Sequence, residues 1–197
     1  KAGFVNILGK PNVGKSTIMN SLVGEKLSII TSKAQTTRHR IQGIVNGDNF
    51  QVIFSDTPGL LDPHYKLQEH MLKSALSTLE DADVIMLVVD VNEDNTIDEA
   101  VLKKMQKSEA SIIVVLNKID LSNQQEVEKQ HNNWEKILPE TTVLPLSAKK
   151  GFNISTLFFF FFKMIPENPT FYPKDEMTDA SLRFFKKEII KKKVMFY

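Results

Sequence analysis

The chain of 197 residues contains no cysteine. This absence excludes disulfides, thiolate zinc sites and a cysteine nucleophile, and it is compatible with a reducing compartment. No apolar run approaches the length of about 20 residues that a membrane-spanning helix needs. No signal peptide precedes the first predicted strand. The chain begins with Lys1 and stops inside a helical pattern, so we expect it to be a piece of a longer protein.

A strong charge of either sign is also lacking, because 25 basic and 24 acidic residues leave a net charge of +1. No global basic field therefore announces a nucleic-acid partner. The balance is uneven, however: residues 171–197 hold seven Lys/Arg and four Asp/Glu, which leaves about −2 for residues 1–170. The length and the composition of 42% hydrophobic residues suit one α/β domain plus a smaller, basic piece.

One stretch organises the chain: residues 9–16 fit the phosphate-binding pattern G-x-x-x-x-G-K-[ST]. The apolar run 4–8 before it predicts a buried strand, and residues 17–23 after it predict a helix, which is the context that the pattern needs. Lys15 is expected to reach the β- and γ-phosphates, and Ser16 to offer its hydroxyl to Mg²⁺. Further phosphate contacts are expected from Gly9, Asn12, Val13, Gly14 and Thr17.

A second motif follows a predicted β-hairpin formed by residues 41–46 and 49–55. Asp56 ends the second strand of this hairpin, and a carboxylate there, beside the P-loop serine, is how P-loop enzymes hold Mg²⁺. Gly59 can bring a backbone N–H close to a γ-phosphate because it has no Cβ. Alone, Asp-Thr-Pro-Gly would be interpreted as a turn after a strand.

The middle of the chain alternates between strands and helices. Continuous apolar runs at 83–90 and 111–116 are typical of parallel strands covered on both faces, and a further strand is expected at 142–146. Helices are predicted over 66–79, 96–107, 124–138 and 154–165. In the second helix, the inward residues are expected to be Ile97, Ala100, Val101, Leu102 and Met105. The alternation predicts an α/β fold with a mostly parallel central sheet and helices on both faces.

A base-recognition motif, Asn-Lys-x-Asp, follows the strand at 111–116. Asp120 can accept hydrogen bonds from N1–H and the 2-amino group of guanine, whereas adenine lacks both donors, so this residue argues against a P-loop ATPase or kinase. Asn117 can tie this loop to the P-loop, and the methylene stem of Lys118 can cover one face of the base. Ser147, Ala148 and Lys149 complete the series, with the Ala148 N–H expected to meet the guanine carbonyl oxygen.

This ordered set of motifs resembles the small GTPase superfamily. More narrowly, the P-loop together with residues 35–40 and 56–60 resembles the Era family of bacterial ribosome-assembly GTPases. The resemblance implies a P-loop GTPase domain that binds GTP or GDP with Mg²⁺ and hydrolyses GTP to GDP and phosphate. It implies that Ser16, Thr37 and Asp56 serve the metal, with Thr36 as the alternative to Thr37 and with Asp56 acting from behind the direct ligands or through water.

The expected catalytic residues are Lys15, Thr37 and Asn12. Ras-like enzymes carry a glutamine where this chain has Leu60, which cannot orient water. Relatives that share an asparagine at position 12 use a bound K⁺, so the resemblance implies K⁺ as a further cofactor. The alternative is that Asn12 only stabilises the loop by a local hydrogen bond; His39 and His64 are weaker candidates.

The expected domains are a GTP-binding domain at 1–166, a linker at 167–177 and, at 178–197, the first helix of a truncated KH-type α+β domain. The resemblance implies small-subunit ribosomal RNA and the 30S particle as partners of the full-length protein. It further implies a monomer in the cytoplasm, with peripheral contact at the inner face of the cell membrane. The alternatives are a switch in another RNA- or membrane-linked process, and a non-enzymatic module whose basic tail is the active part.

Five consecutive phenylalanines, residues 158–162, lie in the last helix of the predicted GTP-binding domain. Phenylalanine on every face of a surface helix is unusual. The run indicates either a docking face or an unreliable stretch of sequence.

Overall fold

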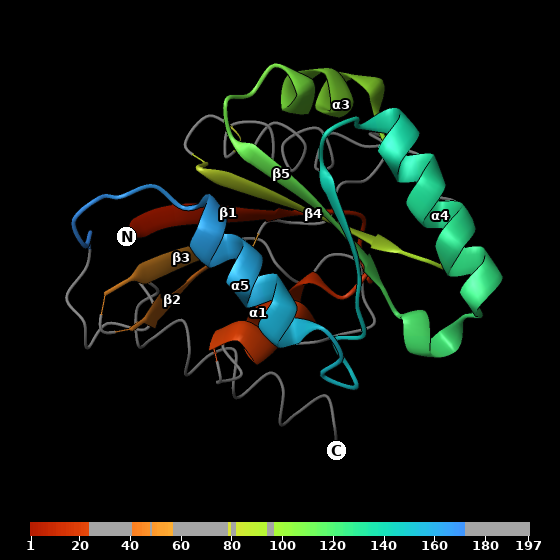
Figure 1. Cartoon of the computed structure of the whole chain (residues 1–197), viewed down its shortest axis with the longest axis horizontal. Coiled ribbons are helices and arrows are strands. Elements are labelled where there is room, and N and C mark those ends of the chain that lie inside the picture. The colour runs from red at the N-terminus through yellow and green to blue at the C-terminus, as the bar shows by residue number, and fades with distance from the viewer. Residues whose placement is uncertain (24–40, 48, 57–78, 80–81, 94–96, 172–197) are drawn as a thin grey trace.

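The computed structural model describes residues 1–23, 41–47, 49–56, 79, 82–93 and 97–171. Within these residues, six strands form one sheet in the order β2-β3-β1-β4-β5-β6. Only β2 and β3 pair in an antiparallel sense; the other neighbouring strands are parallel. Helices α1 and α5 cover one face of the sheet and α3 and α4 the other (Figure 1). The predicted α/β architecture is confirmed.

The helices and strands have the following bounds: β1 Ala2–Leu8, α1 Lys15–Val23, β2 Ile41–Asn46, β3 Gln51–Asp56, β4 Val84–Asp90, α3 Glu99–Gln106, β5 Ser111–Asn117, the 3-10 helix η1 Ile119–Leu121, α4 Gln124–Ile137, β6 Thr142–Pro145 and α5 Ile154–Met164. The helix predicted over 66–79 lies outside the described residues, apart from Leu79.

The central strands are apolar throughout because both faces of the sheet are covered. All seven residues of β4 are buried. Val84, Met86 and Val88 join the core beneath α1 and α5, whereas the alternate residues 85, 87 and 89 join the core beneath α3 and α4. This alternation is the two-residue period of a strand, here with hydrophobic side chains on both sides.

Helix α3 begins later than the sequence predicted. The Asp98 side chain accepts a hydrogen bond from the Ala100 backbone N–H at 2.8 Å, so Asp98 caps the helix and Glu99 is its first residue. The prediction that Ala100 faces inward is wrong, because Ala100 is exposed while Val101 and Met105 form the buried stripe. Ile97 and Leu102 pack partly buried against the same core.

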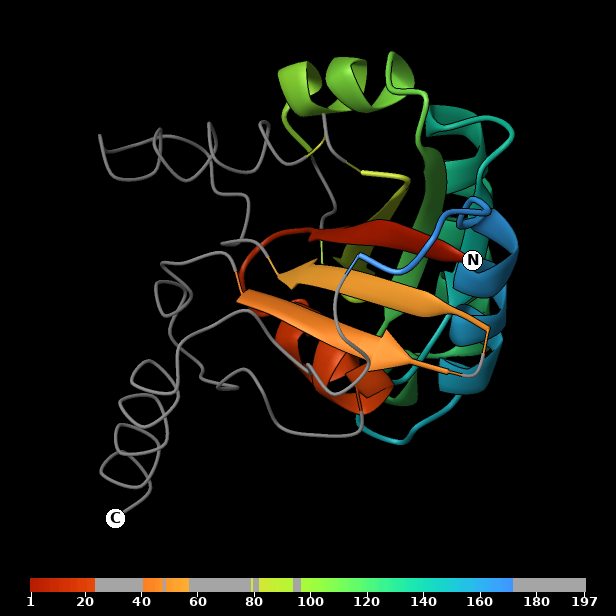
Figure 2. The same ribbon diagram turned by 90° about the vertical axis from the view of Figure 1, so that its left-hand side faces the viewer.

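The turn between β2 and β3 is also longer than predicted. The Gly47 N–H donates to the Phe50 carbonyl oxygen at 2.9 Å, and β3 begins only at Gln51. Figure 2 shows β2 and β3 side by side, extending the sheet beyond β1. The segment after α5 contacts the start of β3, since the Phe171 N–H donates to the Gln51 side chain at 2.8 Å.

Most of the phenylalanine run in α5 is explained by packing. Phe161 is fully buried, with its ring centroid 5.5 Å from that of Phe54. Phe158 and Phe162 contact the ring of Phe50 edge-on, at 5.4 and 5.7 Å. Phe159 is 52% exposed, so of the five phenylalanines it has the most surface available for a docking contact.

No helix in the described part of the chain is long and apolar enough to cross a membrane. The predicted boundary at residue 166 comes directly after α5 and its cap, Ile165. The predicted KH helix and most of the predicted linker fall in residues 172–197, outside the described residues, so this division of the chain stays a prediction.

Candidate nucleotide-binding site

The motifs meet at one edge because the strands that carry them are parallel. The P-loop follows β1, Asp56 ends β3, and Asn117 ends β5. In the sheet, Asp56 pairs with Ile7, two residues before Gly9. The carboxyl ends of parallel strands are where α/β sheets place their ligands. The fold therefore brings these three segments to one edge.

The P-loop needs its glycines for close approach as well as for conformation. Gly9 has φ +148°, and a Cβ there would lie 2.2 Å from the Val88 carbonyl oxygen. Gly14 has φ +101°, and a Cβ there would lie 2.3 Å from Nδ2 of Asn117. Any side chain at either position would displace a neighbouring group of the site. Asn12 adopts the left-handed conformation without being glycine, at φ 63°, and it is exposed.

Lys15 is the first residue of α1 and is 93% buried, with 7% of its surface exposed. Its Nζ donates to the carbonyl oxygens of Gly9, at 3.0 Å, and Lys10, at 2.7 Å. The ammonium is thus held against the loop. Ser16 and Thr17 follow, half-buried, on the first turn of the helix. That turn carries no acidic residue, so the helix N-terminus keeps its attraction for an anion.

Asn117 connects two loops that lie far apart in the sequence. Its Nδ2 donates to the Val13 carbonyl oxygen at 2.8 Å, and its Oδ1 accepts from the Ala148 N–H at 3.0 Å. Asn117 is 2% exposed, so both bonds are buried. The predicted tie between the base-recognition loop and the P-loop is confirmed, and it extends to the loop after β6.

Asp120 is exposed, and its position is set by Ser147. The Ser147 hydroxyl donates to Oδ1 of Asp120 at 2.6 Å and accepts from the Lys150 N–H at 3.2 Å. This hydrogen bond is the main reason why the pKa of Asp120 is lowered, with smaller contributions from the charges of Lys149 and Lys150. Asp120 therefore stays a carboxylate, an acceptor only, over a wider pH range than an ordinary aspartate.

Ala148 differs in detail from the expectation. Its N–H was predicted to meet a guanine carbonyl oxygen, but in this structure it donates to Asn117. Contact with a base would require this amide to share or exchange that bond. Lys149 is exposed beside it. The roles of both residues as base contacts remain predictions.

Several predicted residues cannot be placed. Gly59, Thr36, Thr37, His39, Leu60 and His64 lie outside the described residues, and Asp56 is placed by its backbone only. Within the described residues, no group of three or more His, Asp or Glu could hold a metal ion. Mg²⁺ commonly takes one or two protein oxygens and completes its shell with phosphates and water, so the hydroxyl of Ser16, on the first turn of α1, is a suitable type of ligand for this ion.

The sequence motifs did not identify one residue of the site, Asp90. Asp90, the last residue of β4, is 3% exposed, and its Oδ2 lies 2.6 Å from Nζ of Lys118. The sequence offered only a weak signal, an acidic residue at the end of an otherwise apolar strand, because the pairing of β4 with the strand before the Asn-Lys-x-Asp motif is known only from the fold. The apolar pattern at 83–90 predicted Asp90 only as the end of a strand.

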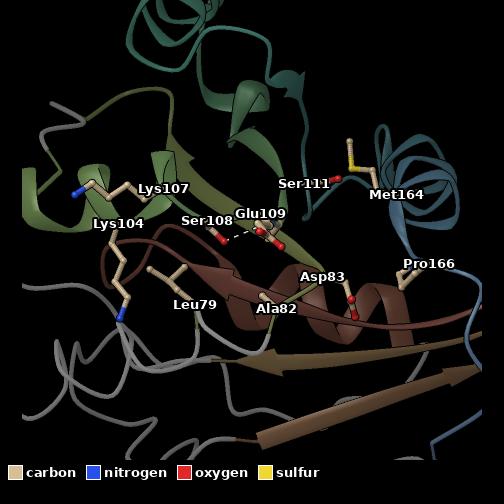
Figure 3. Close-up of a pocket in the computed structure, with 11 residues that line it drawn as sticks. Leu79, Ala82, Asp83, Lys104, Lys107, Ser108, Glu109, Ser111, Met164 and Pro166 are labelled. Carbon is tan, nitrogen blue, oxygen red and sulfur yellow. Dashed lines mark hydrogen bonds between the residues drawn. The ribbon is translucent and has the colours of Figure 1, made fainter.

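A depression of about 660 Å³ lies at the opposite edge of the sheet, at the amino ends of β4 and β5 (Figure 3). The labelled residues come from the region before β4, from the end of α3 and the turn that leads into β5, and from the end of α5 and the residues just after it. Asp83 in its wall accepts a hydrogen bond from the Phe4 N–H at 2.7 Å, and the Ser108 hydroxyl accepts one from the Ala110 N–H at 3.2 Å. These groups serve the fold, and none of the motifs reaches this edge.

Comparison with known proteins agrees with the motifs. The family model of the 50S ribosome-binding GTPases matches residues 4–118. GTPase Era of Clostridium beijerinckii is 41% identical over 196 residues, covering 99% of this chain and 66% of the relative. The chain thus spans about two thirds of the length of the curated relatives it matches.

Two solved structures are similar over nearly the whole chain. One is a crystal structure of Era in complex with MgGDPNP and nucleotides 1506–1542 of 16S ribosomal RNA, with a TM-score of 0.90, 40% identity, and coverage of 99% of this chain and 67% of that one. The other is a variant of Aquifex aeolicus Era bound to GDP and AlF4⁻, with a TM-score of 0.90, 40% identity, and coverage of 100% and 67%. The motifs, the family match and these relatives together show that the chain belongs to the Era family of GTPases.

Proposed function

We propose that this chain binds guanine nucleotides and hydrolyses GTP to GDP and phosphate, as the switch module of a protein that acts in small-subunit ribosome assembly. The observation that carries the proposal is the buried side chain of Asn117, which bonds to both the P-loop and the loop after β6. A phosphate-binding loop and a base-binding loop held by one residue form a site for a whole nucleotide.

The base half of the site selects guanine through Asp120. Its carboxylate is oriented by Ser147 and offers acceptors where guanine has two donors. A base without these donors would leave the carboxylate facing an acceptor, and this mismatch discriminates strongly between bases. The stem of Lys118 supplies apolar surface for one face of the base.

The phosphate half acts through the backbone. The amides of residues 9–16 and the N-terminus of α1 attract the phosphates. When a nucleotide binds, the Lys15 ammonium exchanges its hydrogen bonds to the Gly9 and Lys10 carbonyl oxygens for bonds to phosphate oxygens. Hydrolysis of this kind requires positioning and charge stabilisation, without a covalent intermediate.

The proposed metal residues are Ser16, Thr37 and Asp56. Mg²⁺ held there would supply positive charge that offsets the negative charge of the phosphates during hydrolysis. The hydroxyl of Ser16 lies on the turn that follows Lys15, as a ligand there requires. Thr37 would join when the γ-phosphate is present, and loss of that phosphate would release the segments around residues 28–40 and 57–66.

A monovalent cation is proposed at Asn12. The side-chain carbonyl oxygen of Asn12 is a hard ligand that suits K⁺. Asn12 is exposed, and its side chain makes no hydrogen bond to the residues that the structure describes, which weighs against a purely local role. K⁺ there would offset charge that develops during hydrolysis, a role that an arginine has in other GTPases.

The partners are proposed from the relatives. Era has been crystallised with nucleotides 1506–1542 of 16S ribosomal RNA. We infer that the full-length protein binds small-subunit RNA as a monomer in the cytoplasm, through the KH-type region predicted to begin at residue 178. Peripheral membrane contact stays a prediction of the resemblance, and no observation on the described residues favours it.

Calorimetric titration with GDP, GTP and ATP tests the proposal. Guanine nucleotides should bind and ATP should not, and single-turnover assays should show release of phosphate from GTP. Lys15→Ala, which removes the side chain beyond Cβ together with its ammonium, is the control for hydrolysis by a contaminant. Equal binding of ATP and GTP would overturn the assignment of the Asn-Lys-x-Asp motif.

The RNA proposal needs a comparison of two lengths of the protein. We expect the full-length protein to bind small-subunit ribosomal RNA well and residues 1–197 to bind it poorly. Equal affinity at moderate salt would instead assign binding to the lysine-rich residues 171–197.

A further inference from the structure

We propose that Asp90 is a positioning residue for the base, holding Lys118 ready to cover the face of guanine. The inference rests on the proposed function, because it concerns the same site. Asp90 lies opposite Asn117 in the pairing of β4 with β5, so the carboxylate stands beside the start of the base-recognition loop. Neither the motifs nor the comparisons assign a role to this residue.

The carboxylate of Asp90 is itself firmly held. Its Oδ1 accepts hydrogen bonds from the backbone N–H of Asn92, at 3.0 Å, and from Nδ2 of Asn92, at 3.2 Å. Its Oδ2 meets the ammonium of Lys118 at 2.6 Å, a charge-assisted bond. With the side chain 5% exposed, a carboxylate bonded through both oxygens is a fixed anchor and not one of several transient surface partners.

The same strand end also fixes the backbone of the loop. The Val91 N–H donates to the Asn117 carbonyl oxygen at 3.1 Å, and Nδ2 of Asn92 lies 3.5 Å from the Lys118 carbonyl oxygen. Lys118 has φ 66°, a left-handed conformation that needs support in a residue other than glycine. Lys118 is therefore tied at its backbone and at its ammonium, with only the methylene stem between them.

This arrangement leaves the stem partly accessible, since the Lys118 side chain is 29% exposed. A free lysine would lose rotamer freedom when it packs on a base. A lysine already anchored by Asp90 has lost that freedom in the folded chain, so base binding gains by pre-organisation. The competing explanation is that the ion pair only joins the ends of β4 and β5.

A double-mutant cycle on residues 1–197 separates the two. Asp90→Asn keeps the shape and removes the charge, Lys118→Met keeps the stem and removes the ammonium, and Lys118→Ala removes both. Glu93→Gln, an exposed carboxylate three residues after Asp90, is the matched control. Affinity for GDP, affinity for inorganic triphosphate with Mg²⁺, and the melting temperature are measured for each variant.

If Asp90 positions the stem, Asp90→Asn and Lys118→Met should each weaken GDP about two- to tenfold, the cost of re-immobilising one long side chain. Asp90→Asn should add no further loss in the Lys118→Ala background. Triphosphate affinity should stay within about twofold, as this ligand has no base to cover, and Glu93→Gln should leave both affinities unchanged.

The inference is overturned if Lys118→Met binds GDP like the wild type, or if the losses from Asp90→Asn and Lys118→Ala multiply. An equal loss of GDP and triphosphate affinity would show a merely structural ion pair. Should Asp90→Asn fail to fold, the comparison of Lys118→Met with Lys118→Ala still decides. A loss of GDP affinity in Lys118→Met that is smaller than the loss in Lys118→Ala supports an anchored stem, and a loss in Lys118→Ala alone contradicts it. A wild-type chain that binds no GDP would instead refute the proposed function.

Discussion

The two halves of the site are built from different parts of the chain. The phosphate half consists of backbone: two glycines with left-handed φ, loop carbonyls that hold Lys15, and the first turn of α1. The base half consists of side chains bonded to one another, with Ser147 on Asp120 and Asp90 on Lys118. Backbone amides recognise any phosphate, whereas side chains can match one base. Binding strength and selectivity are therefore expected to respond to different substitutions.

The largest expected effect breaks the phosphate half. Gly14→Val places a β-branched side chain at φ +101° and against the Asn117 amide. Backbone strain alone costs about 2 kcal/mol, and the clash with Asn117 adds to this cost, so nucleotide affinity should fall by more than about 100-fold. Gly151→Ala is the control, since φ is +71° there but no atom lies within 4 Å of the added Cβ. Calorimetry with GDP measures both, and retained binding in Gly14→Val would contradict the description of the loop.

The next effect exchanges the selectivity of the base half. Asp120→Asn should weaken GTP by about 100-fold or more and improve xanthosine triphosphate, because the amide offers a donor where xanthine has a 2-oxo group. Affinities for the two nucleotides are measured side by side. The affinity for inorganic triphosphate should stay unchanged, because the P-loop is intact. A variant that still prefers GTP would remove Asp120 from the site.

A smaller effect concerns the cation at Asn12. GTP hydrolysis should be about tenfold faster in K⁺ than in Na⁺ at equal ionic strength. This gain is smaller than the rate gain that an arginine provides in other GTPases. In Asn12→Ala the difference should vanish. Single-turnover rates in the two salts test this, with GDP affinity as the control for the loop. Equal wild-type rates would leave Asn12 structural and return attention to His39 and His64.

The smallest effect at neutral pH comes from Ser147→Ala. The Ser147 hydroxyl is the main cause of the lowered pKa of Asp120, so its loss raises that pKa toward the ordinary value. Guanine requires the ionised carboxylate, so the variant should lose GDP affinity at a higher pH than the wild type as the pH falls. At pH 7 the Asp120 carboxylate is ionised in the wild type and in the variant, so the GDP affinity should change only a few-fold. Identical pH profiles would show that Ser147 does not tune Asp120.

Local patterns predicted the elements of the fold well, and cooperative details less well. Helix α3 was predicted to begin at 96 because helical spacing continues through Ile97, but the side chain of Asp98 caps the helix and starts it at Glu99. Ala100 was placed inward by the same spacing, yet Val101 and Met105 take the core face. Apolar spacing alone does not decide between neighbouring faces when a small residue fits either.

The sequence alone determined the order of the motifs, the parallel sheet and the class of ligand, because a P-loop and an Asn-Lys-x-Asp motif are short patterns whose chemistry depends on neighbours in the chain. The tertiary structure decided which side chains meet. Asp90 and Lys118 are brought together by the pairing of β4 with β5, and Asn117 reaches Val13 across 104 positions of sequence. Such contacts depend on strand order and register, which no local pattern contains, and so the residue that anchors Lys118 became visible only in the fold.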